Sequence, residues 1–363
     1  MNVDDKRTLV PLANVYKPGK HQLDTKLVSI KLDGMRALWD GGITRGLLCE
    51  SVPFANIEKD HIRLAQPKAT GLWSRYGKAI QAPDSFLDML PEGQMLDGEL
   101  YTDRNQLQIV VGTAKTLVPD KSKWAAINYH VFDAPTYHQF ARIGRIYETH
   151  FKKSFDNTVR DWVLARAGQS DGRWIKGGMT FEEVYKELRS RQDSWSDRMR
   201  LLGQFDAKDH FEQLYEKELA LGGEGVMLRE KYSGWLPNRH DGLLKVKPDF
   251  DSEAIVLGWK SGRKTDLDSR WLGMMGAMLV RWLDGPQGIR DFWISGFNEG
   301  ERTLRDPGIV EWATDNPDTT HPTGEGLLYF SVGESIQFKY GELTSDGVPR
   351  RAVFKRKRRG GED

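Results

Sequence analysis

The chain has 363 residues, of which 39% are hydrophobic and 29% are charged, and its formal net charge is +1. This composition is that of a soluble globular protein long enough for two domains, and it excludes binding of nucleic acid through bulk positive charge. The single cysteine, Cys49, excludes an internal disulfide and a cysteine-rich zinc site. The first residues lack the basic start and apolar run of a signal peptide, and no apolar stretch reaches membrane-spanning length. We therefore expect a cytoplasmic protein.

The segment 29–36, with the sequence SIKLDGMR, is the most informative part of the chain. The apolar residues before Lys31 predict a buried strand, and Asp33 with Gly34 predicts the turn that follows it. Lys31 would therefore be held at the end of a strand, where catalytic groups are often displayed. A lysine becomes a nucleophile only when its surroundings, such as neighbouring cations, disfavour the ammonium form. The alternative is a solvated lysine beside a β-turn.

Further motifs with polar or aromatic residues follow along the first two thirds of the chain. The segment 74–78 reads SRYGK, with Ala82 and Pro83 shortly after it. Predicted strands with the sequences DGEL, YHVFD, GGEGVML and LLKVK cover residues 97–100, 129–133, 222–228 and 243–247. In the last strand the alternation of residues places Lys245 and Lys247 on one face.

Three helices are expected between these strands. A stretch from about Ile143 to Ala167 is amphipathic, although no clear N-cap marks its start. The segments Phe181–Arg191 and Ala207–Leu221 also predict helices, and Gly222 fits the position that ends the last one. Residues before about Pro248 therefore mix strands with helices.

A different organisation begins near residues 248–251, after which strands and loops dominate. Short strands are predicted at 253–259, 274–282, 291–295 and 335–340. One long irregular connection runs from 298 to 326. About five short strands with such a connection suit an OB-type barrel. The expected domains are therefore residues 1–248 and 249–363.

In their order and spacing, these motifs resemble those of the covalent nucleotidyltransferase superfamily, which comprises polynucleotide ligases and RNA capping enzymes. Within it the chain is most similar to the small ATP-dependent DNA ligases of phages and bacteria, because the SRYGK segment resembles their second motif. The resemblance covers nearly the whole chain. It implies an α+β fold, with a nucleotidyltransferase domain (ATP-grasp-like, antiparallel sheets with helices) followed by an OB-fold β-barrel domain. The single cysteine argues against the NAD-dependent ligases, which carry a cysteine zinc module.

The resemblance implies that Lys31 attacks the α-phosphate of ATP, expels pyrophosphate and keeps AMP on its side chain. Lys245 and Lys247 would contact the α-phosphate and complete the catalytic set. A divalent cation, Mg²⁺ or Mn²⁺, would be bound by carboxylates and by the triphosphate. Its candidate protein ligands are Glu224, Glu99 and Asp33.

Nucleotide contacts are implied in the same way. Phe132 would stack on adenine, Ser29 would accept a hydrogen bond from its amino group, and Glu99 would hydrogen-bond the ribose. Arg36 would contact the nucleotide, and Arg75 would contact the 5′-phosphate at a nick. The full candidate set for the nucleotide is Ser29, Ile30, Arg36, Arg75, Glu99, Phe132, Arg350 and Arg358.

Plainer interpretations of these residues stay open. They are a turn cap for Asp33, a surface ion pair for Arg75, core packing for Phe132, a turn position for Glu224 and a solvated strand face for Lys245 and Lys247. Arg45, in the string TRG, is a second candidate for the role of Arg75. The preference for Arg75 implies that about residues 41–71 are an insertion.

The basic run at 350–359 has seven cations in ten positions and resembles the last motif of the family. Arg350, Phe354 and Arg358 give the best spacing, and Ala352 stands where the family has a proline. The alternative is a solvated segment that binds phosphate without regard to sequence. We expect removal of residues 350–363 to impair self-adenylation, while pre-adenylated enzyme still seals a nick.

The expected function is ATP-dependent sealing of 5′-phosphate/3′-hydroxyl nicks in duplex DNA by a monomer that does not contact membranes. The near alternative is an RNA ligase or a capping-type nucleotidyltransferase, which the OB-type domain and the SRYGK segment disfavour. A non-catalytic OB-type nucleic-acid binder is the alternative from another class. The intact nucleophile, glutamates and lysines argue against it.

Overall fold

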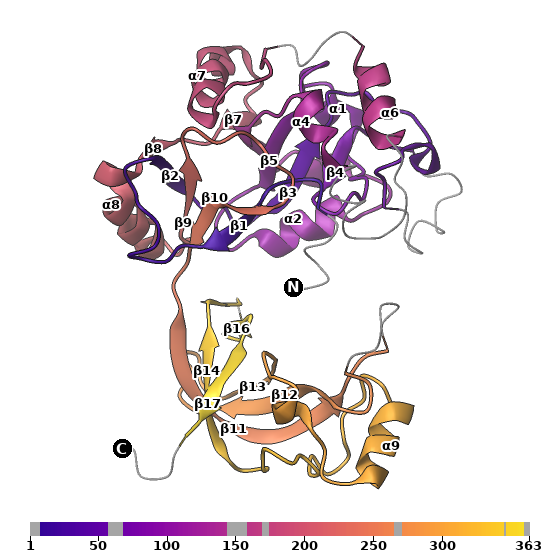
Figure 1. Ribbon diagram of the computed structural model, residues 1–363, viewed down its shortest axis with the longest axis vertical. Coiled ribbons are helices and arrows are strands. Elements are labelled where there is room, and N and C mark those ends of the chain that lie inside the picture. The colour runs from indigo at the N-terminus through magenta and orange to yellow at the C-terminus, as the bar shows by residue number, and fades with distance from the viewer. Residues whose placement is uncertain are drawn as a thin grey trace. The chain divides into compact units, whose positions relative to one another are not determined.

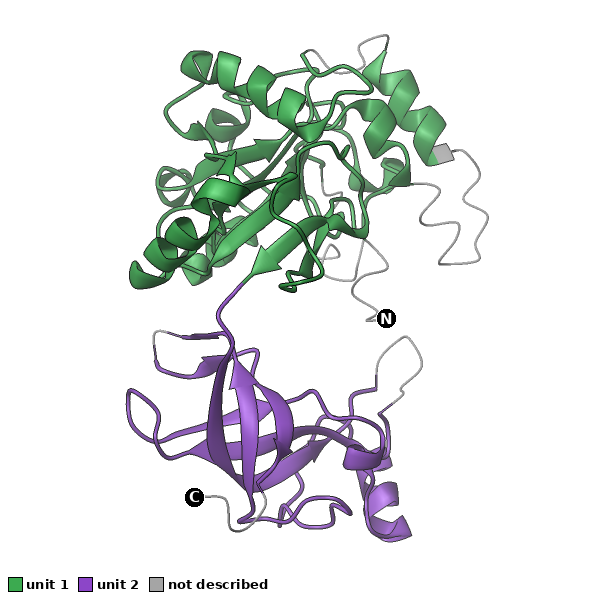
Figure 2. Ribbon diagram, turned by 60° about the vertical axis from the view of Figure 1, so that its left-hand side comes forward, with its two compact units in different colours: residues 1–246 green, residues 247–363 purple. Residues whose placement is uncertain are grey.

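The computed structural model describes residues 8–56, 68–143, 158–168, 174–264, 271–344 and 346–358 (Figure 1). The chain divides into two compact units, unit 1 with residues 1–246 and unit 2 with residues 247–363 (Figure 2). This division falls two residues before the boundary expected from the sequence. Among the helices that the structure describes, none has the length and apolar character that a membrane span needs.

The first sheet of unit 1 carries Lys31 at the end of one strand. In sheet order, its strands within the described residues are β1 (Leu12–Val15), β10 (Arg239–Val246), β9 (Val226–Glu230), β2 (Lys26–Ile30) and β8 (Phe205–Asp206). Because β2 ends at Ile30, the prediction that Lys31 directly follows a strand is confirmed. The pair β1–β10 is parallel and the other pairs are antiparallel, so the sheet is largely antiparallel, as predicted, with one parallel pair that the sequence did not indicate. Strand β1, which makes the parallel pair, was not predicted from the sequence.

Helix α8 (Ala207–Ala220) covers one face of this sheet (Figure 1). Its apolar side chains pack against Val28, Leu228 and Leu244, which lie side by side on three neighbouring strands. Gly222 follows the helix with φ +74°, a conformation that few residues other than glycine adopt, as the sequence predicted. Since α8 occupies this face, functional side chains must lie on the opposite face.

The second sheet of unit 1 carries the aspartate–glutamate motif and the aromatic motif. In sheet order, its described strands are β4 (Leu72–Ser74), β3 (Met35–Trp39), β5 (Leu96–Tyr101), β6 (Asn128–Asp133) and β7 (Met199–Leu201). Here too one pair, β6–β7, is parallel. Helices α2 (Leu107–Ala114), α3 (Lys121–Trp124) and α7 (Phe181–Arg191) share a hydrophobic core with one face of the sheet. The bounds of α7 are those predicted from its apolar spacing.

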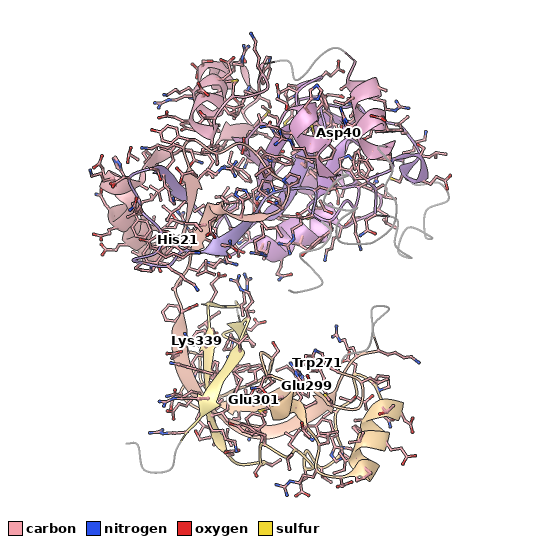
Figure 3. The ribbon with its side chains drawn as sticks, viewed as in Figure 1. His21, Asp40, Trp271, Glu299, Glu301 and Lys339 are labelled. Carbon is pink, nitrogen blue, oxygen red and sulfur yellow. The ribbon has the colours of Figure 1, made fainter. Side chains whose placement is uncertain are left out.

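A second core of unit 1 lies beside the loop that follows β3. The segment 41–56 contributes Phe54, whose ring centroid lies 5.1 Å from that of Trp73. Beneath it Asp40 is fully buried and accepts hydrogen bonds from Thr44 and from the Trp73 ring (Figure 3). The short elements of unit 1 are η2 (Cys49–Ser51), α1 (Asp84–Leu87), α4 (Tyr137–Phe140), α6 (Thr158–Ala167) and η4 (Gln192–Ser194). Of the helix predicted from Ile143 to Ala167, α6 is confirmed, and residues 144–157 lie outside the described chain.

Unit 2 is built around a barrel. In sheet order, its strands in the described segments are β13 (Arg290–Ile294), β12 (Met275–Trp282), β11 (Phe250–Ser261), β14 (Ser335–Tyr340) and β17 (Val353–Lys357). Neighbouring strands are all antiparallel. The sheet closes because Ser295, just after β13, accepts a hydrogen bond from the Phe354 amide at 2.8 Å. A separate two-stranded sheet joins β15 (Glu342–Leu343) and β16 (Pro349–Arg350).

Two expectations for unit 2 are wrong. The connection from 298 to 326 is not wholly irregular, because it holds η5 (Gly300–Arg302) and α9 (Pro307–Asp315), the latter capped by the Asp306 side chain. Glu299, Glu301 and Trp271 lie in this part of the unit (Figure 3). The basic run is also no irregular tail, since half of it is strand β17, Arg350 belongs to β16 and Ala352 is only 5% exposed.

Candidate active site

Lys31 is held at the end of β2 by the loop that precedes β9. Its backbone amide donates to the Gly225 carbonyl at 2.8 Å, which extends the β2–β9 pairing by one step. Its ammonium group pairs with the Glu224 carboxylate, and the two side chains are 22% and 6% exposed. Gly225 has φ +120°, so a residue without Cβ is needed to aim Glu224 at the lysine. The nearest partner of Lys31 is therefore a carboxylate, not the cations that the sequence predicted.

The face of the first sheet opposite α8 carries a row of candidate residues. Ser29 lies opposite Met227, and Met227 lies opposite Lys245, so the three side chains project from the same face of β2, β9 and β10. Ser29 and Lys245 are separated by two strand spacings, about 10 Å. Ile30, the last residue of β2, points to the α8 face by alternation, so only its backbone can take part.

The second sheet presents a matching row on β3, β5 and β6. Arg36 lies opposite Glu99, and Glu99 lies opposite His130. Arg36 is held by Asp97, which accepts from Nε and Nη2 at 2.7 Å each. A Cβ on Gly34 would lie 2.3 Å from the Leu100 carbonyl oxygen, so the turn after Lys31 needs glycine to pass this close to β5.

Phe132 occupies an irregular position in β6. Asp97 pairs with Asp133 and Gly98 pairs with Val131, so Phe132 is the extra residue of a β-bulge. The Arg36 guanidinium carbon lies 4.4 Å from the centre of the Phe132 ring. Bulges often aim a side chain into a site, and the half-buried Phe132 ring is not part of any of the three core clusters of unit 1.

Glu99 is surrounded by three of the predicted cations. Burial raises the pKa of Glu99 to about 7, while Lys31, Arg36 and Arg75 act in the opposite direction and Asp97 adds to the increase. Because charges act on a pKa over short range, these residues belong to one electrostatic cluster. Arg75 follows β4 and lies 4.5 Å over the ring of Tyr76.

Arg45, the second candidate for the role of Arg75, lies in different surroundings. Its guanidinium is held by Asp84 and Asp88, each at 2.7 Å. Arg45 is therefore engaged in surface ion pairs, the role that was the alternative interpretation for Arg75. The cluster around Glu99 includes Arg75 and favours it over Arg45.

Carboxylates suited to a divalent cation lie beside the lysine. Asp33 and Glu224 each offer an oxygen within 4.8 Å of the other. Two neighbouring carboxylates fit the oxygen ligands that Mg²⁺ prefers. Glu99 stands in the row of Arg36 on the second sheet, which suits a ribose contact as well as a cation.

Three of the predicted residues belong to unit 2. Lys247 follows the last residue of β10 and bonds to Glu342 at 3.4 Å, and Arg350 approaches the same carboxylate at 3.5 Å. Arg358 pairs with Glu253, next to the end of β17.

Sequence reasoning missed a set of buried charges next to the site. Asp97 was quoted only as part of a motif, although it is fully buried and also accepts from the Trp235 ring nitrogen at 2.8 Å. Asp133 and Arg229 form a buried pair at 3.0 Å, and burial raises the pKa of Asp133 to about 6. Arg229 follows the apolar residues of the GGEGVML strand, and a charge in such a position was the available signal.

Comparisons with known proteins show which proteins the whole chain and its second unit are similar to. The family described as DNA ligase OB-like domain matches residues 268–358. A DNA ligase from Haemophilus influenzae is 21% identical over 333 residues, which are 92% of this chain and 87% of the relative. A solved structure from a study of Lig E DNA ligases, concerned with DNA binding by a minimal scaffold, is 24% identical, with a TM-score of 0.62 and coverage of 96% of this chain and 98% of the other.

A more distant solved structure is the ATP-dependent DNA ligase from bacteriophage T7 in complex with ATP, at 16% identity and a TM-score of 0.38, with coverage of 98% of this chain and 100% of the other. The resemblance to DNA ligases is confirmed. The α+β fold class, with a nucleotidyltransferase domain followed by an OB-like domain, is confirmed as well.

Proposed function

We propose that the protein is an ATP-dependent DNA ligase that seals nicks in duplex DNA through AMP bound to Lys31. The observation that carries this proposal is the position of Lys31, fixed at the end of β2 beside Glu224 and next to the row of Arg36 and Glu99. The family match and the full-length relative, both DNA ligases, support the same activity.

In the first step, the Lys31 nitrogen attacks the α-phosphate of ATP. A phosphorus–nitrogen bond forms, the bond to the bridging oxygen breaks, and pyrophosphate leaves with the electron pair. The ammonium, which is paired with Glu224, must first lose its proton. Glu224 and Asp33 would hold Mg²⁺ or Mn²⁺, which neutralises charge on the phosphate oxygens. A Glu224 carboxylate that holds this cation would favour the charged form of Lys31 less than the ion pair does.

The two rows of side chains would bind the rest of the nucleotide. Phe132 offers a half-buried ring for stacking on adenine, and Ser29 offers a hydroxyl on the neighbouring sheet. Glu99 would accept from the ribose hydroxyls in its ionised form, and Arg36 is fixed by Asp97 for a directed contact. Lys245 projects from the same face as Ser29 and would contact the α-phosphate.

In the later steps, AMP passes from Lys31 to the 5′-phosphate at a nick, and the 3′-hydroxyl then displaces AMP to form the phosphodiester. Arg75 is exposed and within electrostatic reach of Glu99, a position that suits the incoming 5′-phosphate. Lys247 would contact the α-phosphate together with Lys245, and the cations Arg350 and Arg358 of unit 2 would serve pyrophosphate or the DNA backbone. Nicked duplex DNA is accordingly the proposed partner.

Incubation with α-labelled ATP or GTP tests the proposal. A DNA ligase takes label from ATP, a capping enzyme takes it from GTP, and a non-catalytic binder takes none. Sealing of nicked DNA in preference to nicked RNA would then separate a DNA ligase from an RNA ligase. The protein-bound label should be acid-labile and alkali-stable, as a phosphorus–nitrogen bond is. The reverse lability would contradict a lysine nucleophile.

A further inference from the structure

Buried charges connect the two sheets of unit 1 next to Phe132. On the second sheet, Arg36 forms two hydrogen bonds with Asp97. From the first sheet, Arg229 on β9 donates through Nη2 to Asp133, the last residue of β6, at 3.0 Å. Asp97, Asp133 and Arg229 are 0%, 4% and 5% exposed. The two ion pairs thus bring two cations and two anions together where water has little access.

The two carboxylates of this group lie directly opposite each other. Asp97 on β5 is paired with Asp133 on β6. Like charges at such positions repel, so each carboxylate needs a cation of its own. Arg36 serves Asp97 and Arg229 serves Asp133. Without Arg229, the carboxylate of Asp133 would compete with Asp97 for the guanidinium of Arg36.

Arg229 is poorly suited to a role in stability alone. Its Nε is buried and has no hydrogen-bond partner among the residues that the structure describes. Its other contacts are the Gly234 carbonyl at 3.3 Å and the Phe181 ring at 4.9 Å. Buried ion pairs with an unsatisfied donor are no more stabilising than apolar packing of the same size. The arrangement is therefore better explained by what it does to its neighbours.

We propose that Arg229 is a positioning residue for the nucleotide pocket. By neutralising Asp133, it leaves Asp97 free to hold the Arg36 guanidinium against the Phe132 ring, and so sets the surface on which the nucleotide is bound. This inference rests on the proposed function in one respect, the use of Phe132 and Arg36 for ATP. Under this proposal, Arg229 of the first sheet contributes to nucleotide binding by positioning Arg36 and Phe132 of the second sheet.

The test measures how enzyme–AMP formation depends on ATP concentration. Arg229→Met should raise the half-saturating ATP concentration about tenfold, with a smaller change in the rate at saturation. Asp133→Asn combined with Arg229→Met removes both charges and should return the value to within about threefold of wild type. Because this double variant contains no unpaired buried charge, it also covers the case in which Arg229→Met alone does not fold.

Two further variants separate positioning from stability. In an Arg36→Met background, Arg229→Met should change the ATP dependence by less than about twofold, because the residue through which it acts is gone. Lys26→Met is the matched control, since Lys26 is a buried cation of the same sheet, 6% exposed and paired with Glu230 at 2.7 Å. It should lower the melting temperature without changing the ATP dependence.

The inference is overturned if the folded Arg229→Met variant has the wild-type ATP dependence. It is also overturned if Arg229→Met raises the half-saturating ATP concentration by the same factor in the Arg36→Met background as in the wild-type background. It also fails if the double variant is folded and remains as impaired as the single one. If wild type takes no label, the proposed function fails, and the shift in melting temperature caused by ATP then tests the positioning role. No such shift in wild type would remove both proposals.

Discussion

The Lys31–Glu224 ion pair of unit 1 and the ion pairs of strand β17 in unit 2 both place cations beside carboxylates, but they differ in burial. Glu224 is 6% exposed and Lys31 22%, whereas Lys355 on β17 is 35% exposed and its partner Asp251, at 2.6 Å, is 46% exposed. A buried charge must keep a partner or lose its charge, while an exposed ion pair contributes about 0–1 kcal/mol and is screened by salt. The same residue types therefore suit bond-making in unit 1 and attraction of a phosphate backbone in unit 2.

The comparison predicts its largest effect at Lys31. Lys31→Ala should reduce enzyme–AMP formation by about 10⁴-fold or more, because the attacking atom is removed. The measurement is covalent label from α-labelled ATP in a single turnover. Lys26→Ala, on the strand that Lys31 follows, is the control, and it should lower the free energy of unfolding while labelling continues. Normal labelling of the Lys31 variant would show that Lys31 and Glu224 form a structural ion pair and not a catalytic one.

A second effect is expected at the partner of the lysine. Glu224→Ala should lower the rate of enzyme–AMP formation about 10²- to 10³-fold and weaken its dependence on Mg²⁺, with little change in ATP binding. The reason is that a carboxylate which holds a cation acts mainly on the transition state. Mg²⁺ titrations of the labelling rate would measure this, with Glu230→Gln, at the end of the β9 strand that Glu224 precedes, as control. A wild-type rate with unchanged Mg²⁺ dependence would make Glu224 a turn residue.

Features that depend on neighbouring residues in the chain were predicted from the sequence, and features that depend on contacts between distant residues were not. Helix α7 and strand β14 have their predicted bounds, because local spacing of apolar residues determines them. Lys31 was placed at a strand end for the same reason. Glu224, by contrast, was expected near a metal and not on the lysine. That pairing spans 193 positions and no local pattern reports it.

The elements that were missed are those stabilised by remote contacts. Strand β17 was not predicted because its many cations obscure the spacing of its few apolar residues. Its pairing with Ser295, which closes the barrel, joins segments that are far apart in the sequence. Removal of residues 350–363 would therefore take away a barrel strand, and it is not the clean test of the basic run that the sequence suggested. The Asp133–Arg229 pair spans 96 positions and was missed for the same reason.

The raised pKa of Glu99 gives a smaller, pH-dependent prediction for the buried side of the comparison. Its pKa is about 7 in the folded protein, from 4.5 in the absence of burial. The proton bound in the folded state stabilises the fold fully below pH 4.5, and this contribution is lost as the pH rises through 7. Wild type should therefore lose stability between pH 4 and pH 8 that Glu99→Gln does not lose. The change in the free energy of unfolding from pH 4 to pH 8 should be about 1–3 kcal/mol more favourable to the folded state in Glu99→Gln than in wild type. Urea unfolding at both pH values measures it, and equal pH dependence of the two proteins would contradict it.

The smallest effect is expected on the exposed side. Lys355→Gln should change the free energy of unfolding by no more than about 0.5 kcal/mol, because its ion pair with Asp251 is solvated. If β17 faces the DNA backbone, the same variant should bind nicked DNA about threefold more weakly and reduce the slope of log affinity against log salt by about one. The control is Lys186→Gln, which removes the same charge from an exposed pair with Glu182 on α7 of unit 1. An identical salt slope for both variants would mean that β17 contributes only net charge. A loss of stability at Lys355 as large as that at Lys26 would show that burial does not distinguish the two regions.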